Sequence, residues 1–145
     1  MKHPQMTLAQ YVKKRNGVAL GAAGSLSNML HNSLGAASFA QFWLYWNPIW
    51  GYYLARFIMQ PCRQVMPGAL AIIATFTVSG ALHDLAISLL KAQFVWPLTP
   101  WFSLMGLGVV ATKVFNITYG NQPWPLRAFF NASWVLGCYA IVKLL

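Results

Sequence analysis

A histidine and an aspartate stand side by side, as His83 and Asp84, within the stretch TVSGALHDLAISLL that begins at residue 77. Asp84 is the only acidic residue of the chain, and most of its neighbours in this stretch are apolar. Ionisable side chains inside a membrane segment are costly, and they usually mark a functional site or pair with a partner. Because burial disfavours the charged form of an imidazole, His83 could act as a neutral base that takes a proton from a hydroxyl group attacking a carbonyl.

Helical geometry places further polar side chains next to this pair. An α-helix turns by about 100° per residue, so residues four apart lie on the same face. Since lipid offers no hydrogen-bond partner, we expect the polar side chains of this helix to face the interior of a helix bundle or a cavity. They form two neighbouring rows: Thr75, Ser79 and His83 in one, and Thr77, Asp84 and Ser88 in the other.

The role of Asp84 has more than one interpretation. Candidate partners of its carboxylate are His83, Arg56 and Lys113. Neighbouring side chains on a helix point in different directions, so we do not expect Asp84 to orient the His83 ring as the aspartate of a catalytic triad would. A residue that packs helices together, or that lies at the entrance of a site, fits Asp84 better. The His-Asp pair as a whole also has a structural interpretation, in which its hydrogen bonds only hold two helices together.

No other residue is a better candidate nucleophile. The chain has no G-x-S-x-G motif, and Cys62 and Cys138 have neither a nearby histidine nor a metal-ligand spacing. We interpret both cysteines as small apolar packing residues. Direct transfer between two bound substrates therefore fits better than a covalent enzyme intermediate. His3, His31 and His83 also lack a ligand spacing, so no metal site is predicted.

The composition indicates an integral membrane protein. Hydrophobic residues make up 58% of the chain and charged residues only 8%, against roughly 25% charged residues in an ordinary globular domain. The net charge of +9 comes from basic residues that are spread along the chain, near the ends of apolar segments. Lipid phosphates are the expected partners of such residues. Without a basic stripe, nucleic-acid binding is excluded as the function.

Three apolar segments are expected to span a bilayer, whose core takes about 20 residues of helix. The segments are residues 68–90, 101–119 and 127–144. Loops that contain prolines are expected between them, at residues 91–100 and 120–126. We therefore predict a single all-α membrane domain over residues 1–145, a polytopic helical bundle with three transmembrane helices.

The first 60 residues are less regular. Residues 1–16 are basic and predict a cytoplasmic arm under the positive-inside rule. Residues 17–40 are rich in Gly, Ala and Ser, which is typical of a helix packed within a bundle or of a partly inserted segment. Residues 39–60 are the most aromatic part of the chain and contain Pro48 and Gly51. We expect a broken or re-entrant helix there, near the membrane interface.

Three motifs in this order resemble a known family. FWLYWN covers residues 42–47, LARFIMQP covers residues 54–61, and FTVSGALHD ends at Asp84. The set is similar to the membrane-bound O-acyltransferases, and particularly to their wax-synthase-like branch. The resemblance covers roughly residues 39–90, which corresponds to the C-terminal core of the family, and more loosely the two helices over residues 101–144.

The resemblance implies a function and a set of site residues. Members of this family transfer an acyl group from acyl-CoA to a hydroxyl or amine acceptor inside the membrane. By analogy His83 is the general base, and Asn47 assists by polarising or positioning the acyl carbonyl. Acyl-CoA is then a co-substrate, the acceptor is a lipophilic alcohol, and no further cofactor is needed. The candidate substrate-binding residues are Trp43, Trp46, Arg56, Ser79 and Asp84.

Two other classes of function stay open. The chain could be a non-catalytic subunit of a larger membrane complex, or it could assemble with itself to complete a site. It could also be a proton-coupled transport component that uses Asp84. A cavity bordered by both Asn47 and His83 would favour the enzyme. The aromatic stretch has its own alternative as an interfacial belt that anchors the protein in the bilayer.

Overall fold

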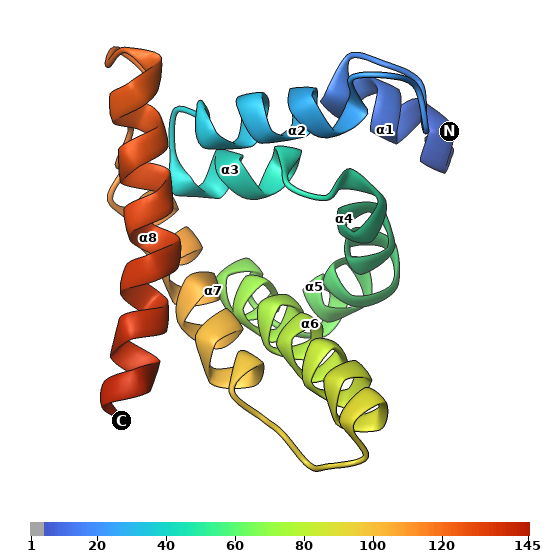
Figure 1. Cartoon of the computed structure of the whole chain (residues 1–145), viewed down its shortest axis with the longest axis vertical. Helices are drawn as coiled ribbons and strands as arrows, with labels where there is room; N and C mark the ends of the chain where they lie inside the picture. The colour runs from blue at the N-terminus through green and yellow to red at the C-terminus, as the bar shows by residue number, and fades with distance from the viewer. Residues whose placement is uncertain (1–4) are drawn as a thin grey trace.

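The structure is a computed structural model that describes residues 5–145, and all regular elements in this range are helices (Figure 1). The predicted all-α class is therefore confirmed. Lys2 and His3, which belong to the predicted basic arm, lie outside the described residues. In chain order the elements are α1 (Leu8–Asn16), α2 (Ser25–Leu34), α3 (Phe39–Tyr45), α4 (Pro48–Leu54), the π-helical turn η1 (Ala55–Met59), α5 (Gln60–Val65), α6 (Gly68–Lys91), α7 (Leu98–Val114) and α8 (Trp124–Leu144).

Helix α6 is the one helix in residues 5–145 that is both long and apolar enough to cross a membrane, with 24 residues and a mean hydropathy of 1.7 over an 18-residue window. It matches the first predicted span. The second predicted span corresponds to α7, which is apolar but has only 17 residues. The third lies within α8, which has 21 residues. By length and composition, only one helix in residues 5–145 could cross a membrane, so the predicted bundle of three transmembrane helices is not confirmed.

Helices α6 and α7 form a closely packed hairpin. Added Cβ atoms show how close the backbones are: one on Gly80 would lie 2.7 Å from the Leu98 carbonyl oxygen, and one on Gly106 would lie 2.9 Å from the Phe76 Cβ. The hydroxyl groups of Thr77 and Ser103 meet across the same interface at 2.8 Å. Glycine at these two positions is what allows the two helices to approach, as small residues do in membrane bundles.

The ends of α7 differ from the predicted segment of residues 101–119. The helix begins at Leu98 because Pro100 lies in its first turn, where a missing N–H leaves no hydrogen bond unmade. It ends at Val114 because Asn116 adopts a left-handed conformation, with φ of 49°. The Ile117 N–H then bonds the Thr112 carbonyl at 2.9 Å, which closes a Schellman-type end. The predicted boundaries were therefore wrong at both ends.

The aromatic segment is broken, as predicted, but at only one of the two expected places. Asn47 takes a left-handed conformation (φ 42°) between α3 and α4, and Pro48 occupies the first turn of α4. Gly51, in contrast, lies inside α4 without interrupting it. A second irregularity follows at the π-helical turn, immediately before Pro61 in α5. Proline removes an N–H and crowds the preceding turn, which accounts for the widened backbone there.

Helix α8 is attached to the turn between α2 and α3 by hydrogen bonds to backbone carbonyls. The fully buried Asn131 donates to the carbonyls of Leu34 (2.8 Å) and Ala36 (3.0 Å) and accepts from the Tyr119 hydroxyl. Burial raises the pKa of Tyr119 to about 12, so this phenol keeps its proton and remains a donor. In Figure 1, α8 accordingly runs past the ends of α2 and α3, although it is far from both helices in the sequence.

The apolar core lies where α3, α6, α7 and α8 meet. Phe39 is completely buried, and its ring stacks on Trp134 of α8 at 5.4 Å between ring centres. Met105 and Val109 of α7 are buried in the same cluster. Aromatic side chains carry large apolar surfaces, so this cluster supplies much of the packing energy that joins the α6–α7 hairpin to α3 and α8.

The close contact at Gly80 predicts a specific sensitivity. Gly80→Ala should lower the free energy of unfolding by roughly 1–3 kcal/mol, since the new methyl group overlaps the α7 backbone. Gly137→Ala in α8 is the matched control, because a Cβ there meets no atom within 4 Å, and it should be neutral or stabilising by up to about 1 kcal/mol. Denaturant unfolding of both variants in the same detergent measures the difference. Equal stability of the two variants would contradict the packing described above.

Candidate functional site

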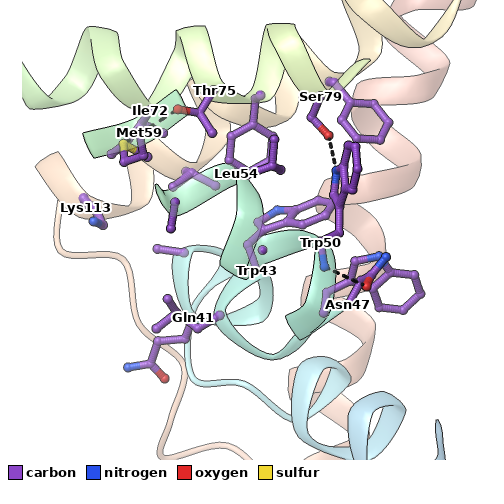
Figure 2. Close-up of a pocket in the computed structure, with 18 of the residues that line it drawn as sticks. Gln41, Trp43, Asn47, Trp50, Leu54, Met59, Ile72, Thr75, Ser79 and Lys113 are labelled. Carbon is purple, nitrogen blue, oxygen red and sulfur yellow. Dashed lines mark hydrogen bonds between the residues drawn. The ribbon is translucent and has the colours of Figure 1, made fainter. Parts of the chain in front are cut away.

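A cavity of about 310 Å³ opens between α3, α4, α6 and α7 (Figure 2). Its volume is within the range of small-molecule sites. Trp50 and Ser79 lie toward one end, whereas Lys113 lies toward the other, on the side of Met59 and Ile72. The residues that line it are Tyr11, Ala40, Gln41, Trp43, Leu44, Trp46, Asn47, Trp50, Gly51, Leu54, Ala55, Met59, Ile72, Thr75, Phe76, Ser79, His83, Phe102, Val109 and Lys113.

The His83 ring borders this cavity with one nitrogen committed and one free. Its Nδ1 lies 2.6 Å from the backbone carbonyl oxygen of Ser79, one turn earlier on α6. A carbonyl can only accept, so Nδ1 carries the proton and Nε2 carries the lone pair. The ring is held between Trp50 (5.6 Å between centres) and Phe102 (5.1 Å). A neutral imidazole in this tautomer can accept a proton at Nε2.

Asn47 also borders the cavity and also has one half of its side chain free. Its Oδ1 accepts a hydrogen bond from the Trp50 backbone N–H at 3.2 Å, as the N-cap of α4. Because that bond uses the oxygen, the amide NH₂ remains available as a donor without charge. The left-handed backbone at this position is one that asparagine tolerates better than most residues.

Trp50 connects the two residues. Its backbone N–H donates to Asn47, and its indole Nε1 donates to the Ser79 hydroxyl at 2.9 Å. The carbonyl of the same serine accepts from His83. The two dashed bonds of Trp50 are visible in Figure 2. The side chain therefore ties α4 to α6 and fixes Asn47 and His83 relative to one cavity wall.

The other predicted substrate-binding residues divide into two groups. Trp43, Trp46 and Ser79 line the cavity. Arg56 does not: its guanidinium donates to the Tyr52 hydroxyl at 2.8 Å and lies on the outer surface of η1. Asp84 is also outside the lining, although it is adjacent to His83 in sequence.

Asp84 holds the start of α7. Its carboxylate is buried and accepts from the Leu98 N–H (3.0 Å), the Thr99 N–H (2.7 Å) and the Thr99 hydroxyl (2.7 Å). The first N–H groups of a helix have no partner within it, and they carry partial positive charge that favours an anion. Asp84 thus caps α7 from α6, and none of the expected partners, His83, Arg56 or Lys113, contributes an ion pair in the part of the chain that the structure describes.

The two predicted polar rows of α6 face different neighbours. Thr75, Ser79 and His83 all line the cavity. The other row faces α7 and the connecting loop, where the Ser88 hydroxyl bonds the Val95 backbone in both directions. The polar side chains of α6 therefore have two roles: one row lines the cavity, and the other joins α6 to α7 and the connecting loop.

Sequence reasoning did not anticipate some of the cavity wall. Phe102 reaches His83 from α7, a contact that depends on the register of the hairpin. Lys113 of α7 also lies in the lining, although its side chain is exposed; a cation within an apolar segment was the signal that could have pointed to it. The Trp43 Nε1 is buried without an acceptor among residues 5–145, so the wall also holds a donor that a ligand oxygen could satisfy.

The described residues contain no group of three His, Cys, Asp or Glu side chains that could hold a metal ion. Within the same residues the two cysteines are free, with Cys138 in the core. No protein-family model, curated protein or solved structure matches the chain.

The capping bonds of Asp84 predict that its removal destabilises the protein. Asp84→Ala should lower the free energy of unfolding by roughly 3 kcal/mol, because each buried donor left without an acceptor costs about 1–3 kcal/mol. Leu85→Ala, at a neighbouring exposed position, should change it by about 0.5 kcal/mol or less. Chemical denaturation in detergent gives both values. An Asp84→Ala protein as stable as the Leu85→Ala protein would show that the cap is not needed.

Proposed function

We propose that this protein is a membrane-embedded O-acyltransferase that moves a fatty acyl group from acyl-CoA to a lipophilic hydroxyl acceptor. One observation carries the proposal: His83 and Asn47 border the same cavity, each with one functional group free. The motif resemblance to the membrane-bound O-acyltransferases supports the same reaction. The mostly apolar lining, which includes Leu54, Ile72 and Val109, suits an acyl chain.

The reaction follows from the two free groups. The acceptor hydroxyl gives its proton to Nε2 of His83 while its oxygen attacks the thioester carbon. Negative charge develops on the carbonyl oxygen, and the Asn47 amide N–H groups are donors suited to stabilise it. The carbon–sulfur bond then breaks, and the departing thiolate takes the proton back from His83. An ester and free CoA leave the site, and His83 returns to its starting tautomer.

We also propose that the chain crosses the membrane more than once, with its N-terminus on the cytoplasmic side. Helix α8, at about 1.5 Å per residue, is about 31 Å long, close to the thickness of a bilayer core. Large apolar side chains project outward along both α6 and α8, which suits contact with lipid tails. They include Leu70, Leu85, Leu89, Phe129, Leu136 and Ile141.

His83→Asn tests the proposed base. Asparagine can place its amide N–H where Nδ1 now donates to the Ser79 carbonyl, but it has no basic nitrogen. Turnover should fall by about 100-fold or more, measured as ester formed from a long-chain acyl-CoA and a fatty alcohol in liposomes. Leu89→Ala, exposed on the same helix, is the control and should keep wild-type turnover. Activity of His83→Asn within threefold of the control would contradict the mechanism, and an inactive wild-type chain would favour the non-catalytic subunit.

Asn47→Asp separates the cap from the donor. Aspartate keeps an oxygen for the Trp50 N–H and is compatible with the left-handed backbone, so the fold should be retained. It lacks the amide donors, and turnover should therefore fall by about 100-fold. Asn116→Asp is the matched control, since Asn116 also has a positive φ but lies outside the cavity. Unchanged turnover in Asn47→Asp would show that the amide does not take part in the reaction.

A further inference from the structure

A second cavity, of about 470 Å³, lies between α1, the α2–α3 turn and the first turns of α8. Four basic side chains line it: Lys14 and Arg15 from α1, His31 from α2 and Arg127 from α8. The segments that supply them are far apart in sequence and meet only in the folded chain. Three of the four carry a permanent positive charge near neutral pH.

Nothing described in the chain neutralises this cluster. Asp84, the only acidic residue, is committed to the start of α7 and does not line this cavity. The Nε atoms of both Arg15 and Arg127 are buried and have no acceptor within residues 5–145. Leaving a buried donor of a charged group without an acceptor costs free energy, and an anion bound in the cavity would supply the missing acceptors.

The wall that holds Arg127 is preorganised. Arg127 donates through Nη1 to the Gly35 carbonyl at 2.6 Å, which fixes the guanidinium and leaves its Nε without an acceptor. The His31 ring stacks on Trp124 with 9° between the planes, and the Trp124 indole donates to the His31 carbonyl at 3.0 Å. A Cβ on Gly35 would lie 2.4 Å from this indole, so glycine is required for the wall to close. Such fixed donors lose little freedom when a ligand binds.

We propose that this cavity binds a phosphate group with two or more negative charges, such as a phosphomonoester or a diphosphate. Guanidinium groups present forked donors that match phosphate oxygens, and a lysine adds a compact charge. Three permanent cations favour a dianion over a carboxylate with a single charge. The phosphate can belong to a lipid headgroup or to a soluble molecule, because both present the same oxygens to these side chains.

The phosphate site and the acyl cavity are adjacent but independent. Gln41 lines both of them, whereas none of the four basic residues lines the acyl cavity. Binding of phosphate does not require acyl transfer to occur.

Titration of the purified full chain tests the site with two probes. Inorganic pyrophosphate in detergent reports a soluble phosphate, and nanodiscs of phosphatidylcholine with phosphatidic acid report a lipid headgroup. At least one probe should bind and raise the melting temperature, and Lys14→Gln/Arg15→Gln should weaken that binding at least tenfold. These two residues are chosen because Arg127 also supports the fold through Gly35. Lys13→Gln, an exposed neighbour outside the cavity, should bind as the wild type does.

The outcomes separate the two sources and define failure. Pyrophosphate binding identifies a soluble ligand, and a response to phosphatidic acid alone identifies a lipid; either supports the site if the double variant loses it. Three results would overturn it: no response to either probe, equal binding by the wild type and the double variant, or an equal response to phosphatidylserine nanodiscs or to acetate at matched ionic strength. Ester formation, measured separately with His83→Asn, reports the proposed reaction and not this site.

Discussion

The arrangement of the site depends on the two hydrogen bonds of Trp50. Through its backbone N–H and its indole, this one residue joins the Asn47 cap on α4 to Ser79 on α6. Ser79 in turn sets the tautomer of His83 through its carbonyl. The bonds of the Trp50 indole and of His83 are partly buried, and shielding from water strengthens a hydrogen bond. The geometry of two distant segments is thus determined by a short chain of bonds with defined donors and acceptors.

The polar residues of α6 illustrate how an apolar chain uses scarce polar groups. Each of them has a partner or faces a cavity: Thr77 meets Ser103, Asp84 caps α7, and Ser88 closes the loop. A carboxylate would be costly in this environment without donors around it. The donors come from the first turn of α7, where helix geometry leaves them free. His83 and Asp84, although adjacent in sequence, therefore have separate roles on neighbouring faces of α6: His83 borders the cavity and Asp84 caps α7.

Much of the local structure could be predicted from the sequence. The helical class, the extent of α6, the break at Asn47 and the inward direction of the polar rows follow from periodicity, proline placement and the rules of helix caps. The shared cavity of Asn47 and His83 was expected only through a motif resemblance, since no local rule brings α4 to α6. Arg56 and Lys113 show the limit: whether a cation faces a cavity or the outer surface depends on helix rotation within the fold.

The parts that could not be predicted all depend on contacts between distant segments. The start of α7 at Leu98 depends on hydrogen bonds to the Asp84 carboxylate of α6 as well as on Pro100, so the boundary predicted from the prolines alone was placed too late in the chain. The cationic cavity brings α1 together with α8, and no periodicity in either segment indicates that meeting. The same holds for Asn131 of α8, because nothing in the sequence indicates that its side chain contacts the turn after α2.

The contacts described above between α6 and α7 are all made by residues of the hairpin itself. The glycine contacts, the Thr77–Ser103 pair, the Asp84 cap and the Ser88–Val95 bonds all lie within residues 68–114. Contacts between segments close in sequence form with a small loss of chain entropy. This pair of helices can consequently form before α8 has been synthesised. The remaining helices then dock on a preformed platform, and the cavity is completed last.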